Sequence, residues 1–239
     1  MKRAVFVFIA PLLVFFTTGC ASSGKATLLA NKDPIALVSV VSNEDVNWKD
    51  EEIKNPATIG PLIRRKLNSD PDLAVITKAD EIIVMAENII RDSIAASPKI
   101  NLAVKEIALN SRAYQDAKIK KYPNRDVIKP EEYRFPDYRD KIFASALAAE
   151  TGIQRSMHVE FNFTKSVYSG LFLYGTCRAN VEMTVIIVDE KGKVLYRRTN
   201  TVPGGSSTRI TNGIYSQSEL KELFRESLSD VCYLFLEQL

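Results

Sequence analysis

Residues 177–198, CRANVEMTVIIVDEKGKVLYRR, contain the clearest strand signal of the chain. Apolar and polar residues alternate over 177–188, and this period of two is typical of a β-strand with one buried face. The next four residues, DEKG at 189–192, favour a turn, and residues 193–198 resume a strand pattern. The stretch therefore predicts an antiparallel β-hairpin in the second half of the chain.

A second alternating stretch, MHVEFNFT at 157–164, precedes this hairpin. Its odd-numbered residues are apolar and should face the core, whereas its even-numbered residues, including His158, should lie on the other face of the sheet. We expect that face to be solvated or covered only by polar contacts. His158 is then interpreted as a polar residue of an open sheet face rather than a catalytic or metal-binding group.

The remaining elements follow from apolar spacing. Residues 35–41 form an aliphatic run typical of a central strand buried on both faces. A short strand is predicted at 73–76, and helical spacing predicts helices over 58–67, from Asp80 to near Ser97, 137–150 and 218–239. Residues 100–135 have weak periodicity and are expected to form an irregular insertion. This order predicts a single α/β (α+β) layered domain over 33–239, with a mixed sheet, a C-terminal antiparallel hairpin and helices packed on the sheet.

The amino terminus has the pattern of an export signal. Two basic residues precede an apolar run at 4–16, which is too short to span a bilayer as a mature helix, and the run ends in TTGC at 17–20. This ending resembles the lipobox of bacterial lipoproteins, although Thr17 stands where leucine is usual. The resemblance implies that Cys20 receives a diacylglyceryl group, becomes the first mature residue and is then N-acylated, for example with palmitate. The alternative is ordinary cleavage near Ala21.

These features predict three parts of the chain. Residues 1–19 are the signal peptide, 20–32 are a flexible tether of mostly small and polar residues, and 33–239 are the folded domain. The expected location is a membrane, through lipidated Cys20. Ala21 is not the aspartate that retains enterobacterial lipoproteins in the inner membrane, so the outer membrane and its periplasmic face are favoured in a cell with two membranes.

Charge gives no sign of a nucleic-acid partner. Removal of the signal leaves 30 basic and 29 acidic residues, so the mature chain is nearly neutral. Residues 112–129 hold six basic and two acidic residues with Tyr114 and Tyr122 between them, which superficially resembles a stacking surface for single strands. An exported protein is not expected to meet nucleic acid, and a membrane headgroup or an acidic partner protein fits the location better. The interpretation that we favour is a solvated, mobile excursion. No nucleic acid is predicted to bind.

The sequence predicts no catalytic residue, no metal and no cofactor. A single histidine without a serine-nucleophile motif argues against a catalytic triad. Cys177 and Cys232 lie 55 positions apart without a CxxC pair, so they do not form a zinc motif. Both cysteines fall on apolar faces, which leaves two alternatives open: a disulfide between hairpin and last helix, or two buried thiols.

An acidic cluster around the only tryptophan supplies the alternative functional hypothesis. Glu44 and Asp45 lie just after the first predicted strand and close to Trp48, with further acids at 50–52. Loops after strands often carry function, and an indole beside carboxylates can stack on a sugar. The hypothesis is a peptidoglycan-binding or cell-wall-acting protein, in which these three residues contact glycan or a partner.

Three segments resemble the periplasmic domains of curli-secretion lipoproteins, penicillin-binding-protein activators and the amino-terminal domain of the Tol-Pal translocation protein. They are the first strand at 35–41, AAETGI at 148–153 with the following strand, and 181–194, with its DEKGKV end. Such domains bind other envelope proteins, so the resemblance implies a non-enzymatic adaptor or assembly factor whose partner is an envelope protein or a second copy. A surface-exposed, host-interacting lipoprotein is the remaining alternative.

Overall fold

The computed structural model describes residues 32–49, 65–66, 68–74, 77–123, 126–171 and 173–239. In these ranges the elements, in chain order, are β1 (Ile35–Asn43), β2 (Asp45–Trp48), β3 (Leu73–Ala74), β4 (Thr77–Lys78), α3 (Asp80–Ala95), α4 (Lys105–Leu109), α5 (Arg112–Gln115), β5 (Val127–Ile128), α6 (Lys141–Thr151), β6 (Arg155–Gly170), β7 (Tyr174–Asp189), β8 (Val194–Pro203), β9 (Thr208–Thr211), β10 (Tyr215–Ser216) and α7 (Gln217–Gln238). The predicted signal peptide, almost all of the tether and most of the predicted 58–67 helix lie outside the described residues.

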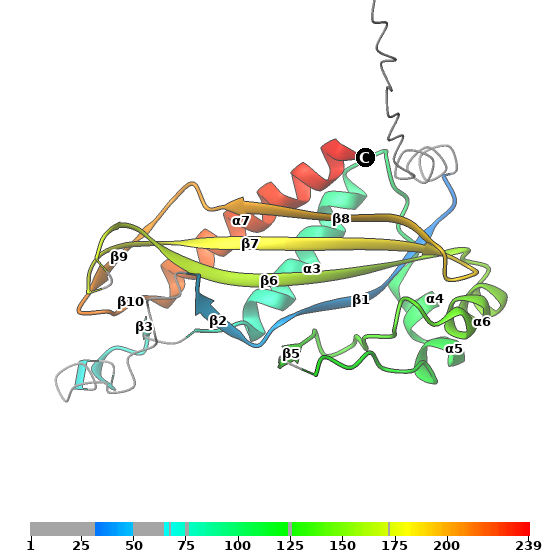
Figure 1. The fold of residues 1–239 in the computed structure, drawn as a ribbon, viewed down its shortest axis with the longest axis horizontal. Helices are drawn as coiled ribbons and strands as arrows, with labels where there is room; N and C mark the ends of the chain where they lie inside the picture. Colours follow the sequence, from blue (N-terminus) through cyan, green and yellow to red (C-terminus); the bar gives the residue numbers. More distant parts are fainter. Residues whose placement is uncertain (1–31, 50–64, 67, 75–76, 124–125, 172) are drawn as a thin grey trace, which may run out of the picture.

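A long antiparallel pair, β6 and β7, forms the centre of a mixed sheet (Figure 1). On one side of β6, β1 and β2 run parallel to it one after the other. On the other side of the pair, β8 and β9 run antiparallel to β7 one after the other. A small second sheet joins β10 to β3. The predicted α+β class, mixed sheet and C-terminal hairpin are confirmed.

The predicted turn between β7 and β8 has a clear local cause. Gly192 takes a φ of 71°, in the left-handed region that glycine adopts without steric strain. The Asp189 carboxylate accepts hydrogen bonds from the backbone N–H groups of Lys191 and Lys193 at 2.9 and 2.8 Å. These bonds fix the short connection and set the register of the two strands.

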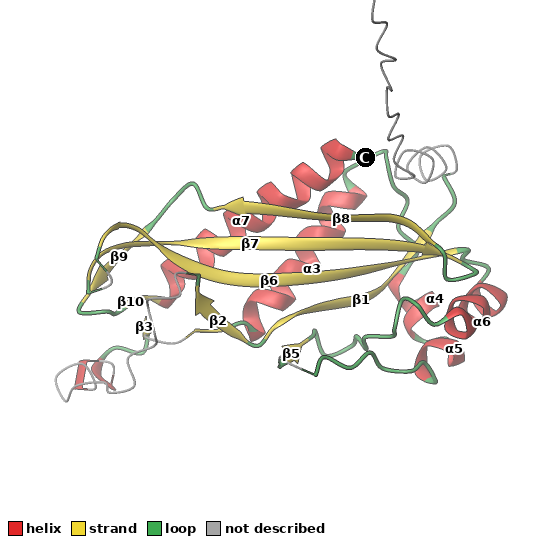
Figure 2. Ribbon diagram, viewed as in Figure 1, coloured by secondary structure: helices red, strands yellow, loops and turns green. Residues whose placement is uncertain are grey.

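Two long helices, α3 and α7, cover one face of the sheet (Figure 2). The apolar stripe of α7 packs its rings edge-on against the strands: Phe224 lies 5.6 Å from Phe163, and Phe235 lies 5.9 Å from Tyr196, between ring centroids. The Ser216 side chain caps the helix by accepting from the N–H of Glu219. The predicted last helix is therefore confirmed, with its apolar face on the sheet.

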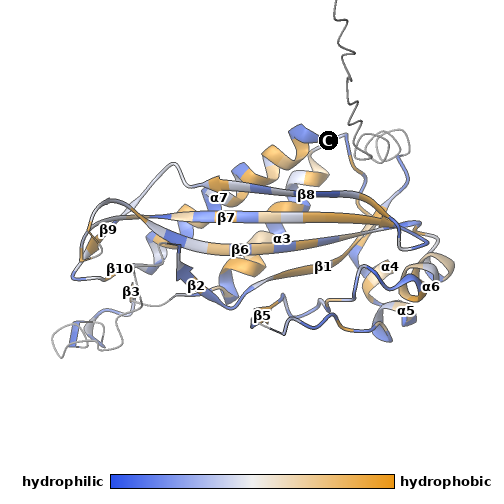
Figure 3. Ribbon diagram, in the orientation of Figure 1, coloured by the Kyte–Doolittle hydropathy of each residue, from blue (hydrophilic) through white to orange (hydrophobic). Residues whose placement is uncertain are grey.

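The first strand is buried as predicted, but it is not central. All residues of β1 but the last are buried, and most of them are apolar, as the hydropathy colours of Figure 3 show. Beyond its pairing with β6, the backbone of β1 pairs only with short pieces of described chain, 101–103 at its start and β5 at its end. The Tyr114 hydroxyl donates to the Val38 carbonyl at 2.9 Å, which satisfies a backbone group midway along this outer strand.

The described residues of 100–135 hold only the short elements α4, α5 and β5, and the prediction that 112–129 are solvated is wrong at Tyr114. Tyr114 and Tyr133 are fully buried. The Tyr133 hydroxyl donates to Glu87 at 3.0 Å and accepts from Arg91, while Lys105 contacts the same Glu87 oxygen at 2.8 Å. Burial raises the pKa of Glu87, but hydrogen bonds from Lys105 and Arg91 outweigh it and leave that pKa below its ordinary value. This network fastens the segment to α3.

The prediction of an open second sheet face is also wrong at the end where β6 begins. His158 is only 2% exposed, because the ring of Tyr138, just before α6, packs edge-on against its ring at 6.0 Å. Further along the face, Glu160 accepts hydrogen bonds from Lys120 and from the Tyr122 hydroxyl. Aromatic and polar side chains from outside the strands therefore cover a face that the sequence pattern assigns to solvent.

Candidate functional site

In the acidic cluster predicted to bind glycan, Glu44 lies just before β2 and Asp45 begins it, the acids at 50–52 lie outside the described residues, and the tryptophan belongs to the core. Trp48 ends β2 and is buried, with its ring edge-on to Tyr215 at 6.2 Å. Glu44 and Asp45 both contact the Lys78 ammonium, at 2.9 and 2.6 Å, across the β2–β4 pair. An indole packed in this way offers no open ring face to a sugar. Trp48 is therefore not placed to stack on a sugar, and Glu44 and Asp45 are paired with Lys78, so their arrangement does not support the glycan hypothesis.

A buried lysine adjoins that tryptophan. Lys165 is fully buried on β6, and its Nζ donates to the Val46 carbonyl at 2.5 Å. The ammonium lies 5.2 Å from the Trp48 ring centroid and 5.5 Å from that of Tyr215, so two aromatic faces surround it. Burial lowers the pKa of Lys165 to about 8, against the raising effect of Cys177 and Asp45. The only sequence signal for this site is a lysine at an inward position of an alternating strand.

Both predicted cysteines are free and buried in the structure. Of the two alternatives, the structure therefore has two separate thiols rather than a disulfide between hairpin and helix. Burial raises the pKa of Cys177 to about 11 and that of Cys232 to about 12, so both stay protonated near neutral pH. Cys177 and Cys232 act as small core residues. Cys20, the predicted lipid-attachment residue, lies outside the described residues.

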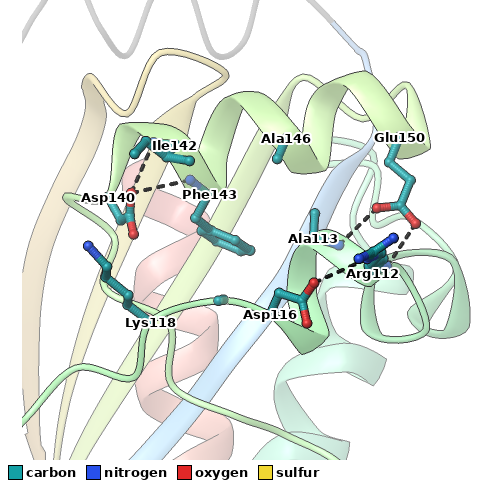
Figure 4. A pocket seen from close by; sticks show the side chains of 10 residues that line it. Arg112, Ala113, Asp116, Lys118, Asp140, Ile142, Phe143, Ala146 and Glu150 are labelled. Carbon is teal, nitrogen blue, oxygen red and sulfur yellow. Dashed lines mark hydrogen bonds and ion pairs between the residues drawn. The ribbon is translucent and has the colours of Figure 1, made fainter.

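An open groove of about 370 Å³ lies between α5 and α6 (Figure 4). Its apolar wall includes Phe143 and Ile142. The surrounding carboxylates are engaged with backbone: Glu150 accepts from the N–H groups of Arg112 and Ala113, and Asp140 caps α6. These backbone hydrogen bonds lower the pKa of Glu150. The groove is therefore a shallow apolar depression in which both carboxylates stabilise helix starts.

The feature best suited to recognition is the outer strand β8. It is ten residues long, and in the described parts of the chain it pairs with β7 alone. Figure 1 shows β8 (orange) as the outermost long strand on its side of the sheet. A strand with one neighbour presents a row of unpaired backbone N–H and C=O groups, to which another extended segment can add.

The register identifies which backbone groups point away from β7. The Gly204 N–H donates to the Ala179 carbonyl at 2.8 Å, just beyond the paired strands. Because hydrogen-bonded and non-hydrogen-bonded pairs alternate along an antiparallel ladder, the odd-numbered residues Thr201, Thr199 and Arg197 direct their N–H groups outward. The proline at 203 fits this alternation, since it has no N–H to offer at an outward position.

Two buried polar atoms on the same strand lack hydrogen-bond partners. They are the Tyr196 hydroxyl and the Asn200 side-chain nitrogen, on residues that are 8% and 5% exposed. Most buried polar atoms in folded domains are hydrogen-bonded, so an exception usually has a specific explanation. Both residues lie on the even-numbered face of β8, where the Tyr196 ring packs against Phe235 of α7, so these atoms give no argument about the outward edge of the strand.

Comparison with known protein families and with curated protein sequences finds no match for this chain. Among the described residues, no group of three or more histidine, cysteine, aspartate or glutamate side chains is placed to hold a metal ion. Over the same ranges, none of the helices combines the length and apolarity needed to cross a membrane. The geometry of the site is thus the basis for assigning a role.

Proposed function

We propose that this chain is an exported lipoprotein, anchored through lipidated Cys20, that acts without catalysis as an adaptor or assembly factor. Its domain accepts an extended segment of another envelope protein along β8. The single observation that supports this role is the ten-residue outer strand with one neighbour among the described residues. Export and anchoring rest on the amino-terminal signal with its Gly-Cys boundary at residues 19–20.

The charge of β8 favours a different protein over a second copy. Arg197 and Arg198 are the only charged residues of the strand and both are exposed. Symmetric antiparallel pairing of two β8 strands would centre near residue 198 and bring these arginines close to their copies. Like charges at facing positions destabilise a strand pair, whereas carboxylates there stabilise it. The partner segment is therefore extended and carries aspartate or glutamate near its centre.

The anchor itself is tested by replacing its cysteine. Cys20→Ala should remove incorporation of labelled palmitate and shift the mature domain from the membrane fraction to the soluble fraction, because the tether then ends without acyl chains. Ser22→Ala, two residues away, is the matched control and should keep both properties. Palmitate labelling or persistent membrane association of Cys20→Ala would contradict the anchor. Protease treatment of intact cells separates a periplasmic from a host-facing orientation.

The edge is tested by removing one outward N–H. Thr201→Pro deletes a donor that faces away from β7, so the domain should stay folded while capture of the partner weakens by about fivefold or more. Thr201→Val keeps the donor and the strand propensity, and it should capture the partner as the unaltered chain does. The measurement is crosslinking in intact cells followed by recovery through a tag at Leu239. Equal recovery with both variants would exclude strand addition at β8.

A further inference from the structure

The turn between the two longest strands presents apolar side chains to solvent. At the end of the β6–β7 hairpin, Tyr168, Leu171, Leu173 and Tyr174 are 57%, 74%, 52% and 61% exposed. Four large apolar side chains within seven residues form a cluster, which isolated surface residues do not. We call these four residues the hairpin tip.

The backbone of the hairpin tip is tightly constrained. Leu171 and Tyr174 exchange backbone hydrogen bonds at 2.9 and 3.0 Å. Gly170 has a φ of +75°, and a Cβ added at Gly175 would lie 2.3 Å from the Ser169 carbonyl oxygen. Only glycine fits these two positions. The described backbone on both sides of the turn is therefore constrained at Gly170 and Gly175.

Two arginines lie beside the hairpin tip, and the nearest acidic side chain among the contacts of this end is that of Glu219, which accepts from the Thr208 hydroxyl at the far end of β9. Arg178 lies over the Tyr168 ring, 5.2 Å from its centroid, and Arg209 lies on β9 opposite Thr176. Residues 166–178 and 204–214, which make up the two sides of this end, contain these two arginines and no aspartate or glutamate. From the end of the hairpin inward, leucines are followed by tyrosines and then by arginines. This order matches the acyl, interfacial and phosphate layers of a bilayer that contains anionic lipid.

The hairpin tip lies far from the predicted anchor. The register places Ile35, the first residue of β1, beside Arg155 at the start of β6, whereas the tip follows Gly170 at its end. Figure 1 shows these two ends at opposite sides of the sheet. At about 3.3 Å per residue, they are separated by roughly 50 Å. The tip is thus placed to contact a lipid surface independently of Cys20.

We propose that the hairpin tip is a membrane-docking site that inserts its leucines and tyrosines into bilayers containing anionic phospholipid. Exposed leucines and tyrosines at the end of a projecting hairpin can enter a headgroup layer. With the chain also anchored at Cys20, the domain holds two contacts with lipid at opposite ends. This site is separate from β8, so the two roles can succeed or fail independently.

The test uses the mature chain with Cys20→Ala and vesicles of phosphatidylethanolamine with phosphatidylglycerol. The chain should cosediment with these vesicles, and far less with phosphatidylcholine alone. Leu171→Ser with Leu173→Ser should lower the partition coefficient by at least about tenfold. Arg178→Gln with Arg209→Gln should reduce binding and its salt dependence. Ile142→Ser, an equally exposed apolar site on α6, and Thr201→Pro should bind normally.

Three outcomes would overturn the proposal. The first is that the Cys20→Ala chain does not bind the anionic vesicles, and the second is that the double-leucine variant binds them equally well. The third is that the chain does not bind vesicles, whereas the double-leucine variant loses a crosslink to a protein in cells. The last outcome would identify a protein as the occupant. Matching circular dichroism and thermal unfolding of all variants ensures that a loss of binding does not reflect unfolding. Because Thr201→Pro is included, failure here leaves the role of β8 unaffected.

Discussion

Replacing Lys165 with methionine is expected to stabilise the protein at neutral pH and to remove a rise in stability at alkaline pH. The pKa of this lysine is about 8 in the folded protein against an ordinary value of 10.5, because it is buried. Between those values the unfolded chain holds more protons than the folded one, so the free energy of unfolding increases with pH. The penalty is complete below pH 8, and a shift of this size corresponds to about 3 kcal/mol.

Methionine has a similar volume and no charge, so it removes this penalty. It also leaves the Val46 carbonyl without the donor that contacts it at 2.5 Å, which costs about 1 to 2 kcal/mol. The net gain at pH 7 should therefore be about 1 to 2 kcal/mol. Urea unfolding at intervals from pH 7 to 10.5 measures both quantities, and Lys191→Met, at an exposed site, should follow the unaltered profile. A Lys165→Met variant that is less stable at pH 7 would show that the ammonium is well accommodated.

Replacing His158 with glutamine is expected to make the protein resist mild acid. Burial lowers the pKa of His158 to about 3 from an ordinary value of 6.5. The folded state therefore holds this ring neutral, and its contribution to stability is present above pH 6.5 and is lost as the pH falls toward 3. From pH 7.5 to pH 5 the loss should be about 2 kcal/mol, at 1.36 kcal/mol for each unit below 6.5.

This effect can be isolated because His158 is the only histidine in the chain. Acidic groups titrate in both proteins, so the difference between the two urea-unfolding profiles over pH 5 to 7.5 reports His158 alone. The glutamine variant should lose about 2 kcal/mol less than the unaltered chain over that range. If the free energies of unfolding of the two proteins changed equally with pH, the His158 ring would be taking up a proton in the folded state. That would require Tyr138 to move away from the His158 ring.

Periodicity predicted the parts of the fold that depend on one buried face. The alternation over 177–188 and the helical stripe over 218–239 each specify their own element, because the apolar side chains point to one layer. The irregular segment could not be predicted in this way. Its core residues, Tyr114 and Tyr133, occur singly among charged residues, and only the fold brings them against Val38 and Glu87.

The functional surfaces were still less accessible to sequence reasoning. Trp48 beside acidic residues has the composition of a binding loop, yet its pairing with β6 places it in the core. Which strand lies outermost depends on long-range pairing, and within residues 194–203 only Pro203, at the end of the strand, is a local sign of an edge. The hairpin tip falls between two predicted strands, and its exposure depends on a turn that projects beyond the helices.

The central claim is that β8 accepts an extended segment of another envelope protein. Photocrosslinking in intact cells tests it most directly, with a photoreactive amino acid at Thr201 and, as the control, at the exposed Ala149 on α6. The account predicts links from position 201 to one envelope protein, within an extended acidic segment, and none of these from position 149. Links from both positions alike, or no link from position 201 in a correctly anchored chain, would contradict it.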